Sequence, residues 1–387
     1  MPLTGLRVVE LAQIIAGPFV GEVMADLGAD VIKVERPEGG DDCRNWTPPE
    51  WHGASPTFHA MNRNKRSVTI DLGSAEGREQ LFRLIEGADI FVQNLRPGVT
   101  EKLGLGPKAM LERNPRLVYC DMGAFGHLGP KRHHPGFEIL FQAYSGLMAN
   151  TGEPDRDPVR MGAQICDFGT GLWTAFGALA ALRQRDRTGK GVVVNTSLLE
   201  TALYFMSTHF AHFDATGKVP QRHPTGSPRV VVFQAFQANN GPIMITAATN
   251  RLFAKLGVAL GRPEWGTDPR FATNADRMAH KEELLGAIQD IIATDTKEHW
   301  MDVLEANGVP CAPVYDLGEA VADPQVQALG MVRQAPDIDA RFVMPAVSFN
   351  GERPAMRRRS PHLGEHNQEV LEAADPWTRR KPVVDQD

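Results

Sequence analysis

Asp167 lies in the stretch GAQICDFGTGLW (162–173), which places a cysteine, an aspartate and two glycines before an apolar run. An aspartate at the start of a helix accepts hydrogen bonds from free N–H groups, and the helix dipole favours its negative charge. The same surroundings would keep the carboxylate ionised, and an ionised carboxylate can act as a nucleophile. Gly169 and Gly171 would let a bulky acyl group approach the backbone closely. These residues alone leave helix capping and nucleophilic attack both open.

Other chemistry-bearing patterns are incomplete. The triplet DFG (167–169) matches the magnesium-binding triplet of protein kinases, but no H-R-D loop precedes it. Neither G-x-G-x-x-G nor G-x-x-x-x-G-K-[ST] occurs, so a NAD or ATP site has no local support. His133 and His134 lack a helical H-x-x-x-H partner, and the four cysteines lack C-x-x-C spacing. We therefore expect no metal site and no tightly bound cofactor.

Composition is ordinary for a globular protein, and the length fits one to three domains: 387 residues, 42% hydrophobic and 23% charged. The net charge of -6 argues against a nucleic-acid partner. The apolar stretches look too short and interrupted to span a bilayer, and MPLTGLRVVEL lacks the layout of a secretion signal. We expect a cytoplasmic protein with no membrane partner.

Short apolar strands alternate with amphipathic helices in the first third of the chain. The expected strands are 6–11, 30–35, 66–72, 89–95 and 116–122. This alternation predicts an α/β fold with a parallel sheet covered on both faces. Such sheets bind ligands beyond the carboxyl ends of their strands, here the turns after Leu11, Glu35, Leu72 and Leu95.

The pattern changes in the second half. Residues 167–184 are apolar or small on every side, which predicts a buried helix, and 188–213 predict a strand feeding a long helix. The segment 214–229 is rich in glycine, proline and charge and is typical of a linker. We expect a large domain beginning with 1–213, a small α/β domain over 230–325, and a segment 326–387 that returns to complete the large domain.

Seven motifs follow one another along the whole chain, and on them the sequence resembles the class III CoA-transferases. They are LRVVELAQIIAGPFVGEVMADLGADVIKVERPEGGDDCRNW, NRNKRSVTIDL, DIFVQNLRPGVTEKLGLG, PGFEILFQAYSGLM, DPVR, TGKGVVVNTSLLE and GVPCAPVYDLGEAVADPQV. The resemblance implies a Rossmann-like parallel sheet in a CoA-binding large domain, a smaller α/β domain, long linkers and an interlocked homodimer. Coenzyme A and its acyl thioester would be substrates.

In this family the acid at the position of Asp167 is the nucleophile, so the resemblance favours attack. The aspartate would attack the acyl-CoA thioester to give an aspartyl–acyl anhydride, and the CoA thiolate would return to form an aspartyl-CoA thioester. The acceptor carboxylate would then run these steps backwards. An anhydride hydrolyses readily in water, so the site must be enclosed.

The resemblance also assigns the CoA contacts. Arg36, Lys102 and, less directly, Arg96 would meet phosphates, and Ala16 would allow close approach of the thioester. The strand ends at 70–72 and 94–95 would line the adenine and pantetheine. The implied CoA-binding residues are Ala16, Arg36, Ile70, Leu72, Asn94, Leu95, Arg96 and Lys102.

Several positions depart from the formyl-CoA enzymes. Those enzymes carry glutamine where Ile15 stands here, with Gln13 two residues earlier, which argues against formate and oxalate. Their glycine-rich loop would fall near 246–252, which contains no glycine. Phe137 and Glu138 replace a common Tyr-Asp pair, and Glu138 would either orient the reacting carboxylate or thioester or lie behind the site. Gln13, Ile15, Phe137 and Glu138 are therefore the expected substrate-pocket residues.

Three alternatives share the fold or the ligand. The α-methylacyl-CoA racemases use a histidine in a G-H-D motif, but Gly136-Phe137-Glu138 stands here and phenylalanine cannot take a proton. A non-catalytic CoA-binding protein would use Asp167 only as a cap, and a hydrolase would need a site open to water.

The acceptor acid is suggested by three strings. GDDCRNW, NRNKRS and DPVR resemble the dicarboxylate-using branch, such as succinyl-CoA:glutarate transferases. The second carboxylate of a diacid needs a cation, because an unpaired buried charge is costly. Arg44, Arg63 and Arg229 are the candidates.

Overall fold

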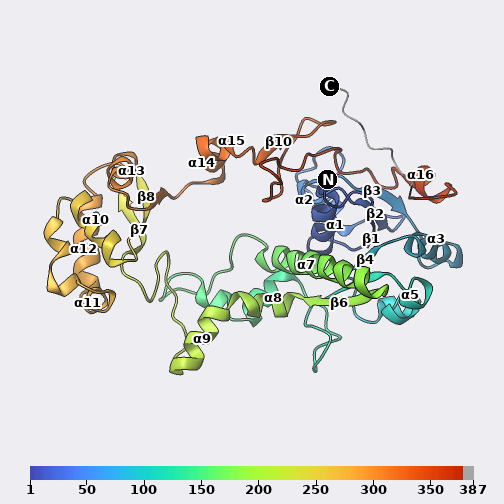
Figure 1. Cartoon of the computed structure of the whole chain (residues 1–387), viewed down its shortest axis with the longest axis horizontal. Coiled ribbons are helices and arrows are strands. Elements are labelled where there is room, and N and C mark those ends of the chain that lie inside the picture. The colour runs from blue at the N-terminus through green and yellow to red at the C-terminus, as the bar shows by residue number, and fades with distance from the viewer. Residues whose placement is uncertain (378–387) are drawn as a thin grey trace. The chain divides into compact units, whose positions relative to one another are not determined.

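The computed structural model describes residues 1–377, which divide into two compact units (Figure 1). The first unit combines residues 1–148, 160–215 and 325–377. The second unit consists of residues 149–159 and 216–324. The sequence thus leaves the first unit twice and returns to it.

The first unit is built on a six-stranded parallel sheet in the order β3-β2-β1-β4-β5-β6. Its strands are β1 (Arg7–Leu11), β2 (Asp30–Glu35), β3 (Arg66–Thr69), β4 (Ile90–Gln93), β5 (Val118–Gly123) and β6 (Val192–Ser197). All five strands expected in the first third of the chain are present, and the parallel α/β prediction is confirmed. The strand order reverses between β1 and β4, and ligands of such sheets bind at that reversal.

Helices cover both faces of this sheet, and neighbouring residues of β1 show why. Val8 packs into a core with Val20 and Ala178, whereas Val9 packs with Leu81 on the opposite face. Successive strand residues point to opposite faces, so strands that are apolar throughout need cover on both sides. The helices of this unit are α1 (Ala16–Asp26), α2 (Pro56–Met61), α3 (Ala75–Glu86), α4 (Val99–Lys102), α5 (Pro107–Arg113), α6 (Glu138–Tyr144), α7 (Ile165–Thr188), α8 (Leu198–Phe205), α9 (Ser207–Thr216) and α16 (Asn367–Leu371).

Helix α7 differs from its prediction in two ways. Ala175, Ala178 and Ala181 lie in the core, but Leu172 and Phe176 are 54% and 65% exposed. The expectation of burial on every side is therefore wrong for the single chain. The sequence prediction found no stretch able to span a bilayer, whereas α7 is long and apolar enough to do so. However, 56% of its most apolar 18-residue stretch is buried within the protein itself.

The second unit has an antiparallel sheet of β7 (Phe233–Ala238), β8 (Gly241–Thr246) and β9 (Cys311–Pro313). Its helices are α10 (Asn250–Ala259), α11 (Asn274–Ala279), α12 (Lys281–Ile292), α13 (Lys297–Ala306) and α14 (Leu317–Ala322). Phe253, Ile288 and Trp300 belong to its separate hydrophobic core. The returning chain carries α15 (Pro324–Ala328) and the hairpin of β10 (Val332–Gln334) and β11 (Arg341–Val343).

Candidate active site

A cavity of about 330 Å³ lies at the carboxyl ends of β1, β4 and β5, within the first unit. We call it the first cavity. Its walls are residues 13–16, 94–97, 122–124 and 135–138, together with Asp167 and Thr170 of α7 and further side chains. It therefore occupies the strand-order reversal where the sheet topology predicts a ligand.

A second cavity of about 250 Å³ follows the carboxyl ends of β1, β2 and β3. Residues 11–13, 34–37 and 70–73 line it together with Leu95. Gln13 and Leu95 line both cavities, so the two meet at these residues. Together they present a path along the edge of the sheet that a long ligand could follow.

The two cavities gather every expected CoA-binding and substrate-pocket residue except Lys102 on α4, which lines neither cavity. Around the first cavity lie Gln13, Ile15, Ala16, Asn94, Leu95, Arg96, Phe137, Glu138 and Asp167. Around the second lie Gln13, Arg36, Ile70, Leu72 and Leu95.

Asp167 is the third residue of α7 and not its cap. The N-cap position belongs to Gln164, whose side chain makes no capping hydrogen bond. The Asp167 side chain is largely buried, and within residues 1–377 no hydrogen bond or ion pair reaches its carboxylate. Burial, followed by the nearby charge of Glu138, raises the pKa of Asp167 to about 7. The expectation that its surroundings hold it ionised is therefore wrong.

Glu138 takes the capping role that the sequence suggested for Asp167. This buried residue begins α6, and its Oε1 accepts hydrogen bonds from Gln142 Nε2 (2.8 Å) and from the backbone N–H of Cys166 (3.3 Å). The second bond satisfies a free donor in the first turn of α7. Glu138 thus fixes the start of the helix that carries Asp167.

Gly169 and Gly171 allow close helix packing and do not leave room for an acyl group. A Cβ on Gly169 would lie 2.4 Å from the ring of Phe205, on α8. A Cβ on Gly171 would lie 2.7 Å from Phe19 and 2.9 Å from the carbonyl oxygen of Ala16, both on α1. The sequence prediction for these glycines is wrong: Gly169 brings α7 against α8, and Gly171 brings it against the start of α1.

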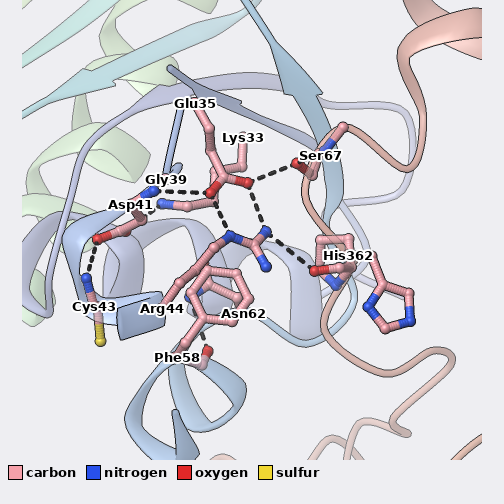
Figure 2. A network of polar contacts seen from close by, with 12 residues as sticks. Lys33, Glu35, Gly39, Asp41, Cys43, Arg44, Phe58, Asn62, Ser67 and His362 are labelled. Atoms are coloured by element: carbon pink, nitrogen blue, oxygen red, sulfur yellow. Dashed lines mark hydrogen bonds and ion pairs between the residues drawn. The ribbon is translucent and has the colours of Figure 1, made fainter. Parts of the chain in front are cut away.

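The three arginines considered for a distal carboxylate are not in the cavity walls. Arg44 donates to both carboxylate oxygens of Glu35, at 2.7 and 2.8 Å (Figure 2). Arg63 is buried in ion pairs with Asp26 and Glu22, so Arg44 and Arg63 are both committed to scaffold carboxylates. Arg229 belongs to the second unit.

Arg96 and Arg36 remain beside the cavities. Among the described residues that line the first cavity, Arg96 alone is cationic, and its side chain is exposed. Arg36, half exposed at the second cavity, pairs with Asp42, which lines the first.

Sequence reasoning missed several wall residues. Thr170 lies three residues after Asp167, so helical spacing could have found it. Asp42 follows two glycines in GGDD, but its pairing with Arg36 depends on the fold. Ile14 has a positive φ of 74°, for which the sequence gives no signal because isoleucine rarely adopts it. Across residues 1–377 no cluster of three or more His, Cys, Asp or Glu could hold a metal ion.

Comparison with known proteins identifies the family. Residues 3–367 match the model of CoA-transferase family III. The chain is 35% identical to a succinate–glutarate CoA-transferase of Agrobacterium fabrum, covering 96% of this chain and 95% of that one. It is also 35% identical to an acetyl-CoA:oxalate CoA-transferase of Acetobacter aceti, covering 94% and 93%.

A solved structure agrees. The crystal structure of a CAIB/BAIF family protein from Brucella suis superposes with a TM-score of 0.86 at 36% identity, covering 96% of this chain and 99% of that chain. The chain belongs to CoA-transferase family III and is an enzyme that uses CoA thioesters as substrates.

Proposed function

We propose that this enzyme transfers CoA from succinyl-CoA, or a similar acyl-CoA, to a dicarboxylic acid, with Asp167 as the nucleophile. The observation that carries the proposal is a buried carboxylate, without a partner among residues 1–377, at the meeting point of α7, α1 and the sheet edge. The similarity to the Agrobacterium succinate–glutarate enzyme supports the choice of donor and acceptor.

The chemistry needs four acyl exchanges. Asp167 Oδ attacks the thioester carbonyl, the C–S bond breaks, and CoA leaves as a thiolate while an anhydride forms. The thiolate then attacks the aspartyl carbonyl, which releases the donor acid and leaves an aspartyl-CoA thioester. The acceptor carboxylate attacks this thioester, which forms a second anhydride and frees the CoA thiolate. The thiolate then attacks the acceptor's carbonyl in that anhydride, which gives the new acyl-CoA and restores the Asp167 carboxylate.

Two features of the first cavity support these reaction steps. The carboxylate must be ionised to attack, and a pKa of about 7 makes that form accessible at neutral pH without strong stabilisation of the charge. The N-terminal end of α1 carries no side-chain cap and contributes Ala16 to the wall. Its partial positive charge would favour the negative charge that develops on the carbonyl oxygen.

We place the thioester of CoA in the first cavity and its nucleotide in the second. Gln13 and Leu95, common to both, would contact the pantetheine between them. Arg36 would bind a phosphate, while Ile70 and Leu72 would contact the adenine. Lys102 lines neither cavity, so Arg36 is the stronger phosphate candidate.

We assign the distal carboxylate of the acceptor to Arg96, the cation of the first cavity. Ile15, Phe137 and Leu198 give the same cavity apolar wall positions, which favour a diacid with a carbon chain over formate or oxalate. Oxalate belongs in any test, because the similar Acetobacter enzyme is named for it.

We also propose that the enzyme is an interlocked homodimer. Leu172 and Phe176 of α7 and Phe210 of α9 are 54%, 65% and 64% exposed. Large apolar residues with this exposure, on helices of one unit, support an interaction surface. Mass determination in solution should give twice the chain mass; a monomer that transfers CoA at full rate would contradict the dimer.

Hydroxylamine trapping tests the nucleophile. Incubation with succinyl-CoA and no acceptor, followed by hydroxylamine, should convert Asp167 to a hydroxamate that peptide mass spectrometry locates. The neighbouring Glu138 serves as an internal control and should stay unmodified. A CoA-binding protein or a racemase would give no label, and label on another residue in an active enzyme would reject Asp167.

A panel of acids tests the acceptor. With succinyl-CoA as donor, acids the size of glutarate, malate or itaconate should accept CoA with double-displacement kinetics. Arg96→Ala should raise the KM for diacids more than the KM for succinyl-CoA. Preference for formate, oxalate or any monocarboxylate over every longer diacid would contradict this assignment while leaving the nucleophile intact.

A further inference from the structure

The turn after β1, residues 12–15, is held in place by side chains from other segments. It forms part of the wall of the first cavity and leads directly into α1. Four of its backbone polar groups make hydrogen bonds to side chains. The carbonyl oxygens of Ala12 and Gln13 accept from Lys33 Nζ (2.8 Å) and Asn94 Nδ2 (2.8 Å). The N–H groups of Gln13 and Ile14 donate to Asn94 Oδ1 (2.9 Å) and Asp41 Oδ1 (3.0 Å).

Ile14 is the strained residue of this turn. Its φ of 74° lies in the left-handed region, where a β-branched side chain is a clear outlier. Such a conformation is costly and persists only where neighbouring contacts impose it. The hydrogen bond from Ile14 N–H to Asp41 is the contact that reaches this residue's own amide.

Asp41 is itself fixed by a buried charge network (Figure 2). Its Oδ2 lies 2.8 Å from Lys33 Nζ, and both side chains are fully buried. Its Oδ1 also accepts from Cys43 N–H, and its own N–H donates to Glu35. Lys33 is further held by Glu10 at 2.9 Å. One ammonium group therefore binds the Ala12 carbonyl directly and the Ile14 amide through Asp41.

We propose that Asp41, locked by Lys33, is a positioning residue that imposes the left-handed backbone at Ile14 and so sets Ile15 and Ala16 at the wall of the Asp167 cavity. Neither Asp41 nor Lys33 lines that cavity, so their effect on the reaction passes through the turn. The kinetic part of this proposal rests on the proposed transferase function.

The test replaces one carboxylate with an amide. Asp41→Asn keeps the size of the side chain and weakens its hold on Lys33, so we expect kcat for CoA transfer to fall by about 10²-fold, as for other misplaced groups. The KM for succinyl-CoA should change less than about twofold, because the walls of the second cavity beyond the turn are untouched.

Asp26→Asn is the matched control. Asp26 is also buried and bound to an arginine, Arg63, but it lies at the far end of α1 and lines neither cavity. The same substitution there should lower the melting temperature to a similar degree and leave kcat unchanged.

A double-mutant cycle separates positioning from general damage. Glycine adopts a positive φ without the penalty that isoleucine incurs, so Ile14→Gly should depend less on Asp41. We expect Asp41→Asn to cost several-fold less in kcat in the Ile14→Gly background than in the wild type. A merely structural role for Asp41 would give the same cost in both backgrounds.

Amide hydrogen exchange gives a readout that needs no activity. A peptide spanning residues 12–19 should exchange faster in Asp41→Asn than in Asp26→Asn. If Asp41→Asn does not fold, Asp41→Glu keeps the charge opposite Lys33 and displaces the acceptor, with the same expected changes.

Two results overturn the proposal: a folded Asp41 variant with the kcat of the control, or unchanged exchange in the turn. Wild-type protein without any CoA transfer would instead reject the proposed function, and the exchange comparison would still decide the role of Asp41.

Discussion

Asp41 and Asp167 are buried aspartates of the same unit, 1% and 8% exposed, yet their surroundings are opposite. Burial alone would raise the pKa of Asp41, but the charge of Lys33 and hydrogen bonds from Lys33, Cys43 and Ile14 hold it below its usual value. Asp167 has no such partners among the described residues, and burial with the charge of Glu138 raises its pKa to about 7. One carboxylate is paired and fixes backbone, while the other is left available to react.

The contrast extends to the surroundings of each residue. Around Asp41 the buried acids meet Lys33 and Arg44, so charge is balanced within hydrogen-bonding distance. The described walls of the first cavity instead hold Asp42, which pairs with Arg36, together with Glu138 and Asp167, which no ion pair reaches within residues 1–377. In this molecule the imbalance of charge, and not burial, separates the candidate site from the scaffold.

The largest expected difference between the two aspartates concerns activity. Asp167→Asn should reduce CoA transfer by more than about 10³-fold, because an amide is not nucleophilic and no other wall residue replaces it. Steady-state assays with succinyl-CoA measure this. Folded Asp167→Asn or Asp167→Ala protein that keeps more than a few per cent of activity would contradict the role of Asp167 as the nucleophile.

The next difference concerns stability at neutral pH. Asp41→Asn should lower the free energy of unfolding by about 3 kcal/mol. This is the low end for breaking a buried ion pair, because Lys33 would still be paired with Glu10. The loss should be constant between pH 5 and 8, because Asp41 is ionised in both the folded and unfolded states there. Urea unfolding at several pH values measures it, and a loss below about 0.5 kcal/mol would mean that the pair stabilises little.

Asp167→Asn should change stability in the opposite direction. The folded pKa lies above the unfolded value, so the wild type loses stability as pH rises from about 4 through 7. The asparagine variant avoids this loss and should be more stable than wild type, on the order of 2 kcal/mol at pH 8, with a smaller gain at pH 5. A variant that is less stable than wild type at pH 8 would contradict the absence of stabilising partners at Asp167.

The pH dependence of activity sharpens the role of Glu138. The value of kcat/KM should rise with pH and reach half its maximum near pH 7, where Asp167 ionises. Glu138→Gln removes a nearby negative charge while keeping an acceptor for Cys166, so the midpoint should move to lower pH. A midpoint unchanged by this substitution would mean that burial alone sets the pKa.

The smallest expected effect compares two surface cations. Arg36→Ala should raise the KM for every acyl-CoA by about tenfold. This is the low end for a charge-assisted phosphate contact, because Arg36 is half exposed and is also paired with Asp42. Lys102→Ala should change the KM less than about twofold because Lys102 lines neither cavity. Equal effects would place a phosphate nearer to α4 than we propose.

The sheet and the location of the site could be predicted from the sequence. Strands such as β4 (IFVQ) are short runs of mostly apolar residues, and the carboxyl ends of parallel strands share one edge by geometry. Strand ends and the family resemblance together predict Gln13, Asn94 and Leu95 at the site, and all three line the first cavity.

The availability of charged groups could not be predicted, because it depends on partners distant in sequence. Arg63 is bound by Asp26, 37 residues away, and the arginine alone gives no sign of this. The acceptor that caps α7 could not be predicted for the same reason, since it belongs to Glu138, 28 residues before Cys166. Spacing between neighbouring residues reports on local structure, whereas pairing of buried charges is a tertiary property.

The hydrogen bond from Cys166 N–H to Glu138 has a consequence for turnover. During the proposed cycle Asp167 would pass through an anhydride and a thioester, both uncharged and both poorer acceptors than a carboxylate. If Asp167 itself capped α7, each intermediate would loosen the helix that carries it. Because Glu138 holds that end of the helix, Asp167 could form and lose each proposed intermediate repeatedly while the start of α7 keeps the same hydrogen bond.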